Sequence, residues 1–428
     1  MNPVLLLIPT TSYRAEAFLE AARSEAVPVV VGSDRAPVLA EMTGGGLHVD
    51  LGDAETAAGQ IAAFHARQPL AAIIGVDEGT AAVAARASEV LGLPHNPPHA
   101  AAAASHKARV REALWAAGVP QPSYRVISPE ETGAEAARRI NHYPAVLKPV
   151  GLAGSRGVLK AEDSGEFASA LERVRAIAAD TDAATGLNPS REVVAEAYLP
   201  GGEVALEGLL LNGTLHVLAL FDKPEPMEGP TFEETIFTTP SRLPADTQAA
   251  VRRRTQDAVA ALGLTDGPIH AELRLTPDEG PVPLEVAPRS IGGLCGRVLR
   301  FGTGLSLEGL ILRHAVGRVP QPAPARVPQP APECIPEPPA REAAPVGVMM
   351  LPVPAAGTFE RMDGLDEARA LDGVDEISVT IAPGTPVRPL PEGDRYLGFI
   401  FAHGDDPASV TATLQAAAQI LRPVIEPE

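Results

Sequence analysis

The sequence contains little of what several protein classes require. Aromatic residues make up 4% of its 428 residues, and it has two cysteines, Cys295 and Cys334. The cysteines are far apart and have no metal-ligand spacing, which predicts reduced thiols and a cytoplasmic location rather than a disulfide framework. No apolar run approaches the ~18 residues of a membrane span. The first run, Val4 to Ile8, is also too short for a signal sequence and follows no basic segment.

Basic charge is scarce relative to acidic charge. The chain has 35 Lys and Arg against 54 Asp and Glu, a formal net charge of -19. A protein this acidic repels nucleic acid and anionic membranes, and its low aromatic content argues against base stacking. The apolar content of 45% is ordinary for a globular protein, and the length allows two or three domains. We therefore expect small-molecule substrates, with neither nucleic acid nor membrane as a partner.

Residues 1 to about 100 alternate apolar strands with amphipathic helices. Strands are predicted at Val4–Ile8, Val27–Val31 and Ala71–Gly75, with a helix at Arg14–Glu25. Continuous apolar strands of this length are typical of a parallel sheet covered on both faces, so this segment is predicted to be Rossmann-like. The turn after the first strand, residues 9–13, lacks the G-x-G-x-x-G pattern. Dinucleotide binding at that turn is therefore not expected.

Composition changes twice in the rest of the chain. A helix is predicted from Ser105, as N-cap, to Gly118, followed by strands and turns to about residue 290. Proline then dominates residues 319–345, where a Val-Pro-Gln-Pro-Ala-Pro run is repeated, which indicates an extended linker or a PxxP-type ligand. Residues 346–428 return to mixed strand and helix, with a strand at Tyr396–Phe401 and a helix at Pro407–Leu421. This segment is predicted to be a small separate lobe.

A pair of carboxylates is the first candidate site. Strands at Ile269–Leu275 and Val282–Ala287 flank a turn, which predicts an antiparallel hairpin. If Leu275 pairs with Val282, Glu272 lies opposite Glu285, and two like charges so placed need a shared proton, an arginine or a divalent cation. Oxygen ligands favour Mg²⁺, which commonly uses one or two carboxylates plus substrate phosphates. The alternative is a hairpin neutralised by Arg274 or Arg289.

A lysine and a glycine-rich loop form the second candidate site. Lys148 ends an otherwise apolar strand and leads into Gly151-Leu-Ala-Gly-Ser-Arg-Gly157. Glycines such as Gly154 let the backbone approach phosphate oxygens, and Ser155 adds a hydroxyl donor. The pattern is not a Walker A loop. A solvated edge lysine is the alternative interpretation.

The third candidate is the strand at Val193–Leu199, with Glu196, Tyr198 and Leu199, followed by a turn to Glu203. Such a strand and turn can offer backbone groups to adenine and a carboxylate to the ribose hydroxyls. An ordinary strand–turn–strand is the alternative.

Taken in order, these stretches resemble the ATP-grasp superfamily. The resemblance rests on the helix with Lys107, Tyr143-Pro-Ala-Val-Leu-Lys-Pro149 with its loop, Glu196 to Glu203, Glu272 and Leu284-Glu-Val-Ala-Pro-Arg289. It covers nearly the whole chain and implies an α/β fold with α+β lobes. The implied domains are a Rossmann-like pre-ATP-grasp domain at 1–100, an ATP-grasp domain at 101–318, the linker at 319–345 and the C-terminal α/β lobe at 346–428. Within the ATP-grasp domain, residues 120–200 would be the ATP lid and residues 201–318 the large lobe.

The resemblance also implies roles for individual residues. Lys107 and Lys148 would hold the ATP phosphates beside Gly154 and Ser155; Glu196, Tyr198 and Leu199 would line the adenine pocket, with Glu203 at the ribose. Glu272 and Glu285 would hold Mg²⁺, with Mn²⁺ as the alternative. Residues 221–242 and Pro288–Leu294 resemble the dipeptide-forming L-amino-acid ligases, in which a carboxylate attacks the γ-phosphate and an amine then displaces phosphate. Arg289 would bind the carboxylate and the developing charge, and Glu234 the substrate ammonium group.

Other ATP-grasp activities remain open. Ala287 stands where many ATP-grasp enzymes have a metal-binding Asn, which motivates a non-catalytic ATP-binding protein as one alternative. A biotin-carboxylase-like or purine-synthesis-like enzyme is another, although the chain has no biotin-type Met-Lys-Met. Gly292 and Gly293 are expected to leave room for a bulky substrate side chain beside Arg289. The expected partners are carboxylate and amine substrates, which the resemblance implies to be amino acids, and family members are often dimers.

Overall fold

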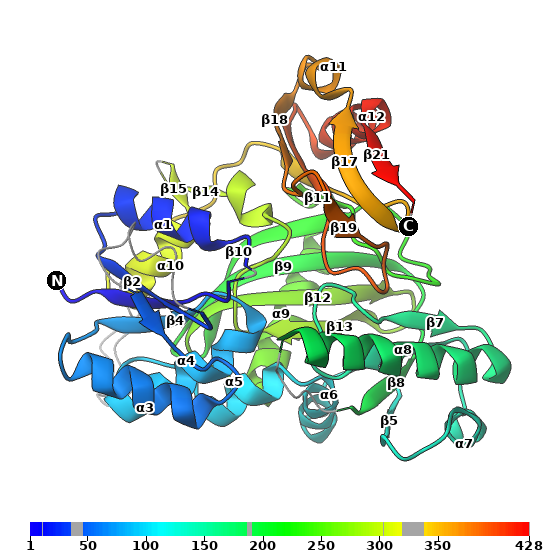
Figure 1. Cartoon of the computed structure of the whole chain (residues 1–428), viewed down its shortest axis with the longest axis horizontal. Coiled ribbons are helices and arrows are strands. Elements are labelled where there is room, and N and C mark those ends of the chain that lie inside the picture. Colours follow the sequence, from blue (N-terminus) through cyan, green and yellow to red (C-terminus); the bar gives the residue numbers. More distant parts are fainter. Residues whose placement is uncertain (11, 36–45, 186–190, 303, 319–337, 428) are drawn as a thin grey trace.

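The computed structural model describes residues 1–10, 12–35, 46–185, 191–302, 304–318 and 338–427. Figure 1 shows a long curved sheet through the centre, with the N-terminal unit at one end and two smaller layers at the other. Most of the predicted linker, residues 319–337, lies outside the described residues, as does Cys334. None of the described helices combines the length and apolar character needed to cross a membrane.

The N-terminal unit is a four-stranded parallel sheet covered on both faces. Its strand order is β3-β2-β1-β4. The strands are β1 (Val4–Leu7), β2 (Val29–Ser33), β3 (Gly46–His48) and β4 (Ala72–Gly75), and the helices are α1 (Ala15–Ser24), α3 (Ala54–His65) and α4 (Glu78–Leu91). Leu6 packs with Phe18 of α1, while Leu5 packs on the other face with Ile61 of α3. Alternate residues thus enter two cores, which explains the unbroken apolar run and confirms the predicted parallel sheet.

Two short helices connect this unit to the rest of the chain. They are α5 (Pro98–Ala104) and α6 (Lys107–Ala116). Ser105 is the C-cap of α5, and His106 is the N-cap of α6. The prediction of Ser105 as N-cap was therefore wrong, because an alanine run starting at Pro98 forms a separate helix that ends there. Gly118, with φ +68°, follows the helix as predicted.

A four-stranded antiparallel sheet follows, in the order β5-β8-β6-β7. Its elements are β5 (Tyr124–Ile127), α7 (Gly133–Arg139), β6 (Ala145–Pro149), β7 (Leu159–Ala161), α8 (Ser164–Thr185) and β8 (Val193–Ala197). Leu147 of β6 packs with Phe167 and Leu171 of α8, whereas Val146 belongs to a cluster on the opposite face. Lys148 shares that opposite face with Val146, because strand residues alternate.

The central sheet has eight strands, in the order β13-β12-β9-β10-β11-β16-β20-β18. Its first five strands in the chain are β9 (Gly202–Leu211), β10 (Thr214–Lys223), β11 (Ile236–Thr239), β12 (Gly267–Thr276) and β13 (Gly280–Ala287). Helix α9 (Ala245–Leu262) covers one face, where its Val259 packs with Leu206 and Ile269. The residues that alternate with these, including Glu203 and Glu207 on β9, lie on the other face of the sheet.

After β13 the chain forms a short irregular layer against the N-terminal unit. It comprises the 3-10 helix η1 (Cys295–Val298), β14 (Arg300–Phe301), β15 (Leu305–Ser306) and α10 (Leu307–Ala315). Ile311 of α10 packs into the same core as Leu6 and Phe18. The Cys295 thiol is buried here and free of any disulfide within the described chain.

The C-terminal segment both extends the central sheet and adds a small one. Strands β16 (Val346–Leu351), β20 (Gly398–His403) and β18 (Val374–Val379) continue the central sheet. The remaining elements are β17 (Gly357–Asp363), α11 (Leu365–Arg369), β19 (Thr385–Val387), α12 (Pro407–Ile420) and β21 (Arg422–Glu426), with β19-β17-β21 forming a three-stranded sheet. Because β11 pairs with β16, backbone hydrogen bonds join this segment to the preceding one. The domain boundaries remain predictions, and the central sheet contains strands from both before and after residues 319–345.

Candidate active site

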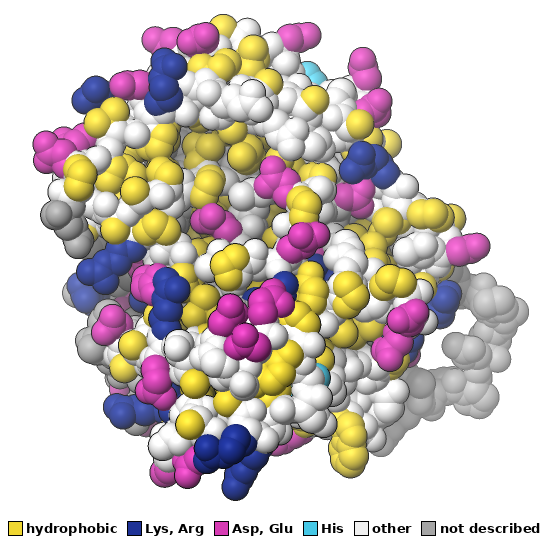
Figure 2. Space-filling model, turned by 90° about the vertical axis from the view of Figure 1, so that its right-hand side faces the viewer, with side chains coloured by type: hydrophobic (Ala, Val, Ile, Leu, Met, Phe, Trp, Pro, Cys, Tyr) yellow, Lys and Arg dark blue, Asp and Glu magenta, His cyan; other side chains and the backbone are white. Residues whose placement is uncertain are grey.

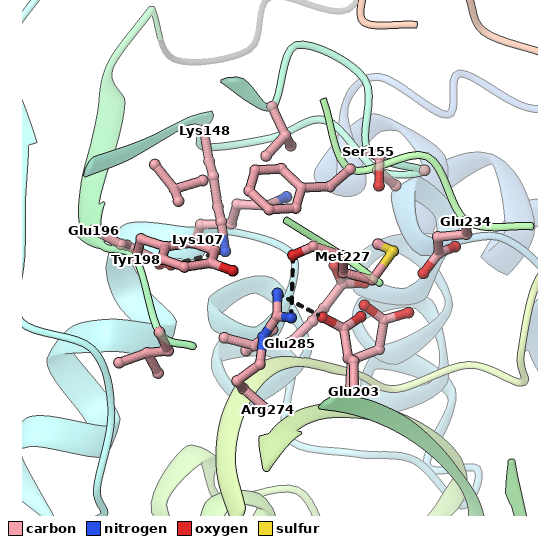
Figure 3. A pocket seen from close by; sticks show the side chains of 18 of the residues that line it. Lys107, Lys148, Ser155, Glu196, Tyr198, Glu203, Met227, Glu234, Arg274 and Glu285 are labelled. Carbon is pink, nitrogen blue, oxygen red and sulfur yellow. Dashed lines mark hydrogen bonds and ion pairs between the residues drawn. The ribbon is translucent and has the colours of Figure 1, made fainter. Parts of the chain in front are cut away.

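A pocket lies between the four-stranded sheet and the open face of the central sheet (Figure 3). Eleven of the twelve residues predicted for the site line it. They are Lys107, Lys148, Gly154, Ser155, Glu196, Tyr198, Leu199, Glu203, Glu234, Glu272 and Glu285. Arg289 does not line the pocket but contacts Glu285 directly. Residues nearly 180 positions apart in the chain are thus brought together.

The wall formed by β6, β8 and α6, called here the lid wall, is rich in cations. Lys148 Nζ lies 2.7 Å from Glu196, which Arg111 contacts at 2.6 Å from the other side. Burial alone would raise the pKa of Glu196, but the charges of Arg111 and Lys148 outweigh it and hold that pKa at about 2. Glu196 is therefore an ionised anchor for two cations. Lys107 Nζ donates a hydrogen bond to the Leu152 carbonyl, at the start of the glycine-rich loop.

The glycine-rich loop has the backbone expected of a turn that cradles an anion. Gly154 has φ +65° and Ser155 has φ +57°, so two successive residues lie in the left-handed region. A Cβ at Gly154 would meet no atom within 4 Å, so glycine serves the backbone conformation here rather than close packing. Gly157 N–H donates a 3.0 Å hydrogen bond to the Pro391 carbonyl, which ties the loop to the C-terminal segment.

An apolar part of the pocket, called here the apolar slot, lies beside this loop. The rings of Tyr198 and Phe232 stack with centroids 6.4 Å apart, next to Val146 and Val158. The Tyr198 N–H is already bonded to the Pro144 carbonyl at 3.0 Å. Of the predicted adenine contacts, Tyr198 therefore offers its ring rather than its backbone donor.

The opposite wall, formed by β9, β10, β12 and β13 and called here the acid floor, is an ordered row of charges. Glu203 on β9 pairs in register with Lys223 on β10 and with Arg274 on β12. Their side chains form ion pairs, with Lys223 at 2.6 Å and Arg274 at 3.1 Å from Glu203. Cross-strand neighbours of opposite charge stabilise a sheet, so the register itself places this row. Arg274 therefore neutralises Glu203. It does not neutralise the pair of Glu272 and Glu285, which was the alternative interpretation of the hairpin.

The predicted pairing of Glu272 with Glu285 is confirmed, although its premise was wrong by one residue. Leu275 pairs with Pro281 rather than Val282, and Arg274 pairs with Val282. A register shift between Glu272 and Leu273 restores the predicted alignment, because Leu284 is an extra residue on β13. Both carboxylates consequently line the pocket that Lys148 also lines.

Glu272 and Glu285 differ in how much positive charge lies beside them. Glu272 lies 3.1 Å from Lys223 Nζ and 3.3 Å from His270 Nε2. Glu285 contacts Arg289 at 3.3 Å, but Arg289 also contacts Glu78 at 3.1 Å. Burial and the negative charges of Glu78 and Glu272 raise the pKa of Glu285. The positive charges of Lys107 and Arg289 lower it, but by less, so the net shift is upward. Glu285 therefore has less positive charge beside it than Glu272 has. The oxygen-only donor set of the pair fits a divalent cation.

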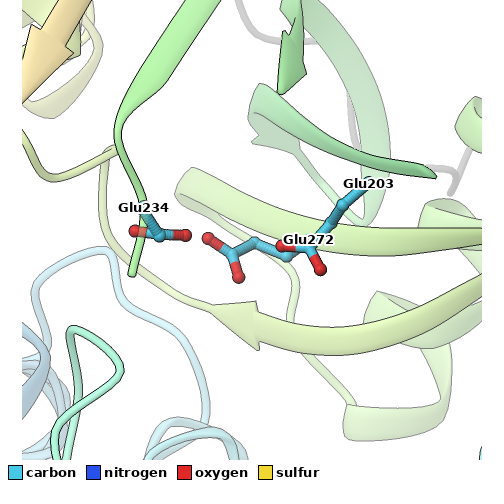
Figure 4. A group of neighbouring side chains, drawn as sticks. All are labelled: Glu203, Glu234 and Glu272. Atoms are coloured by element: carbon cyan, nitrogen blue, oxygen red, sulfur yellow. The ribbon is translucent and has the colours of Figure 1, made fainter. Parts of the chain in front are cut away.

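Glu234 lies in the segment before β11 and completes the acid floor. It contacts Lys223, which thus binds Glu203, Glu234 and Glu272 together. Burial and the neighbouring Glu272 raise the pKa of Glu234 to about 8. Figure 4 shows the three carboxylates directed toward one another.

Arg289 lies between the N-terminal unit and the acid floor. Its guanidinium contacts Glu78, from the first turn of α4, as well as Glu285. The Tyr13 hydroxyl accepts a 2.8 Å hydrogen bond from Gly293 N–H, so the N-terminal unit also holds the loop after Arg289. The room expected at Gly292 and Gly293 is filled. A Cβ on Gly293 would lie 2.5 Å from the Met350 sulfur, because the loop packs onto β16.

Tyr396 brings the C-terminal segment to the same region. Its ring packs against Phe399, which in turn packs against Tyr13. Its hydroxyl is buried and has no hydrogen-bond partner among the described residues. Burial, with the negative charges of Glu234 and Glu233, raises the pKa of this hydroxyl well above its usual value. A buried hydroxyl left unpaired beside an acidic group is a candidate ligand contact.

Sequence reasoning missed four residues of the site: Arg111, Lys223, Glu78 and Tyr396. One signal was available, because the chain contains only four lysines among its 35 basic residues. All four, Lys107, Lys148, Lys160 and Lys223, lie at or beside the pocket, where Lys160 Nζ lies 4.4 Å from the Tyr198 ring centre. In a chain that otherwise uses arginine, each lysine marks a position that needs a compact ammonium group.

Two family models match the chain. Residues 141–298 match the ATP-grasp domain, and residues 349–426 match the L-amino acid ligase C-terminal domain 2. The L-amino acid ligase from Bacillus licheniformis superposes with a TM-score of 0.78 and 25% identity, over 99% of each chain.

Two curated relatives align over about half of the chain. Carnosine synthase 1 from Gallus gallus is 34% identical over 55% of this chain and 26% of its own length. The alanine–anticapsin ligase from Bacillus subtilis is 28% identical over 53% of this chain and 50% of its own. The chain thus matches a quarter to a half of the length of these relatives.

The fold and the two matched domains define the class: the chain is an ATP-grasp carboxylate–amine ligase, an ATP-dependent enzyme that forms C–N bonds. Enzymes of this class use ATP with a divalent metal ion. Within it, the chain resembles the dipeptide-forming L-amino acid ligases, since it carries their C-terminal domain as well as the ATP-grasp domain.

Proposed function

We propose that this protein joins the carboxylate of one amino acid to the amine of another, with ATP as the energy source and Mg²⁺ as the metal. The observation that carries the proposal is the opposition of charge across one pocket. The lid wall sets Lys107, Lys148 and Arg111 against the single carboxylate of Glu196. Across the pocket, the acid floor presents Glu272 and Glu285. These two carboxylates would bind a cation that also contacts the phosphates.

The nucleotide would lie along this pocket. Its phosphates suit Lys107, Lys148, Gly154 and Ser155, which line one side. Its adenine suits the apolar slot at Tyr198 and Leu199, with Glu203 at the ribose. Glu196 would act by holding Lys148, since both of its oxygens already contact cations.

The metal ion would be held by Glu272 and Glu285. Bound there, it would neutralise phosphate charge and help align the γ-phosphate. Ala287 is fully buried and pairs with His270 on β12. Its methyl side chain has no oxygen or nitrogen atom, so it offers no metal ligand. Two carboxylates and the substrate phosphates remain, which suffices for Mg²⁺.

The amino-acid substrates would lie at the end of the acid floor that is next to Arg289 and Glu234. Arg289 can bind the carboxylate and stabilise the charge that develops on it. Glu234 can pair with a substrate ammonium group, and the Tyr396 hydroxyl lies in the electrostatic field of Glu234. Met350 and Tyr13 fill the space beside Gly292 and Gly293, which favours a small side chain at that point.

The reaction would take two steps. A carboxylate oxygen of the first amino acid attacks the γ-phosphorus; the bond to the bridging oxygen breaks and ADP leaves. The neutral amine of the second then attacks the carbonyl carbon, phosphate leaves, and the proton of the new amide nitrogen passes to phosphate or solvent. The chain's own residues contribute alignment and charge neutralisation, because phosphoryl transfer needs little covalent chemistry from the protein.

A screen of amino-acid pairs for ADP release, with mass spectrometry of the products, tests this function. We expect ADP release that requires both an amino acid and an amine, and a product of their summed mass less water. Tight ATP binding without turnover across the panel would favour a non-catalytic ATP-binding protein. ADP release with bicarbonate in place of an amino acid would favour a carboxylase.

The location of the protein, its assembly and the limits of its domains are proposed from the sequence alone. The reduced thiols support a cytoplasmic location, and the net charge of -19 supports the absence of a nucleic-acid partner. On the face shown in Figure 2, acidic side chains gather near the middle of the molecule. A homodimer is proposed only by the resemblance, and sedimentation of the full chain would test it.

A further inference from the structure

Lys223 is the most completely paired charge of the acid floor. It ends β10, is 7% exposed, and contacts Glu203 at 2.6 Å, Glu272 at 3.1 Å and Glu234 at a shorter distance. An ammonium group has three N–H donors. Here it donates hydrogen bonds to Glu203 and Glu234 and forms an ion pair with Glu272. The Phe237 ring centre lies 5.0 Å from Nζ on a further side. The ammonium group therefore occupies the place of a small bound cation.

The three carboxylates come from separate elements. Glu203 lies on β9, Glu272 on β12, and Glu234 in the segment that leads into β11. One oxygen from each lies within 4.8 Å of the others, so without a cation they would repel one another strongly. They would serve three different parts of the reaction: the ribose, the metal ion and the substrate ammonium group.

Arginine would match this position less well than lysine. Its planar guanidinium matches one carboxylate in a fork, whereas an ammonium group reaches three in different directions. Of 35 basic residues in the chain only four are lysines, and one of these stands here. The chemistry of the cluster thus favours a compact cation.

We propose that Lys223 is a positioning residue that acts as a fixed internal cation, holding Glu203, Glu234 and Glu272 in place and keeping free divalent ions out of their cluster. The roles of the three carboxylates in this inference rest on the proposed function. A divalent ion is then retained only where Glu285 and the phosphates of ATP add ligands. The site is thereby kept free of metal until the nucleotide arrives.

Binding of Mn²⁺ to the full-length protein without nucleotide, followed by the electron paramagnetic resonance signal of free Mn²⁺, tests the proposal. K223M leaves three carboxylates without their cation. We expect it to bind Mn²⁺ at least about tenfold more tightly than the unsubstituted protein, because clustered carboxylates are hard-cation ligands. K223R, which keeps a positive charge near the carboxylates, should show a smaller gain. A purely structural lysine would destabilise the fold when lost and would create no metal site.

Two controls keep the test decisive. K160M removes another lysine, paired with Glu162 at 2.7 Å outside the cluster, and should leave Mn²⁺ affinity unchanged. If K223M does not fold, K223M/E234Q removes the carboxyl group of Glu234 together with the positive charge of Lys223. It is then compared with E234Q alone, and a gain in Mn²⁺ affinity is again expected.

Folded K223M with the Mn²⁺ affinity of the unsubstituted protein would overturn the proposal, as would no gain in the double variant over E234Q. Neither measurement involves turnover. Failure of the amino-acid screen would instead overturn the proposed function and leave the Mn²⁺ result standing, so the two can be told apart.

Discussion

The two walls of the pocket solve opposite electrostatic problems. On the lid wall, Glu196 is one carboxylate between Arg111 and Lys148, with Lys107 nearby. On the acid floor, Lys223 is one ammonium group among three carboxylates, while Glu285 shares Arg289 with Glu78. The lid wall therefore carries an excess of positive charge, and the acid floor an excess of negative charge.

This difference has a physical reason and a consequence. Buried charges are tolerated only when paired, so each wall contains enough opposite charge to fold. The surplus on each side remains for a ligand. A ligand that presents anionic phosphates to one wall and a divalent cation to the other would neutralise both at once.

The largest expected effect comes from the acid floor. E285Q removes one carboxylate of the proposed metal pair, and we expect kcat for ADP release to fall about 10³-fold, because metal stabilisation of the phosphates is lost. E279Q is the matched control, since Glu279 is exposed in the turn of the same hairpin. Equal rates for E285Q and E279Q would show that Glu285 does not hold the metal ion.

The next largest effect concerns the stability of the lid wall. Glu196 has a folded-state pKa of about 2, below its usual 4.5, so its stabilisation is present above pH 4.5 and is lost as the pH falls toward 2. The shift corresponds to about 3 kcal/mol. Denaturant unfolding should show E196Q destabilised at pH 7 by about this amount, with the gap narrowing at pH 3. A gap independent of pH would show that Glu196 is not ionised between its cations.

Loss of Lys148 should lower catalysis and also remove one of the two charges that stabilise Glu196. K148M is expected to lower kcat/KM for ATP about 10²-fold, because a charge aimed at the phosphates disappears while Arg111 still pairs with Glu196. R139M, at an exposed arginine on α7 of the same lobe, is the control and should change the value little. An unchanged kcat/KM in K148M would contradict the charge difference between the walls.

Tyr396 tests whether the C-terminal segment contributes to the substrate site. Its hydroxyl is buried and unpaired among the described residues. If it binds substrate, Y396F should raise the KM of an amino-acid substrate about tenfold, the effect of one lost hydrogen bond. If it does not, Y396F should leave KM unchanged and increase thermal stability, because an unsatisfied buried group has been removed.

The smallest effect concerns the contact between the lid and the C-terminal segment. Arg173 of α8 contacts Glu392 at 2.6 Å, and both side chains are partly exposed. Such a pair contributes less than about 1 kcal/mol. E392Q should therefore raise the KM for ATP by no more than about fivefold, an effect that is larger at low salt. A change insensitive to salt would point to a cause other than this ion pair.

Local patterns in the sequence predicted most of the fold and site. The unbroken apolar runs predicted the parallel sheet, and the turn at residues 276–280 predicted the hairpin. Lys148 was found because a charge in an otherwise apolar strand is unusual, and Glu272 and Glu285 were found because the predicted hairpin sets two like charges opposite each other. The extra residue Leu284 shows the limit of this reasoning, since the correct pairing depended on a bulge that alternation does not reveal.

Contacts between distant segments could not be predicted in this way. Arg111 looks like any helix arginine until α6 packs against β13, where it donates to the carbonyls of Pro283 and Leu284. Glu78 belongs to the N-terminal unit, yet it shares Arg289 with Glu285. The C-terminal segment extends the central sheet through β16, and this pairing is not visible in the local sequence pattern.

The sequence alone determined which chemical groups are present and how they alternate along each strand, because side-chain direction follows from local backbone geometry. Only the tertiary structure decided which charge each group faces. Ion pairing and burial depend on distance in space, and the pKa of Glu196, the threefold pairing of Lys223 and the room beside Gly293 each arise from segments that no local pattern connects.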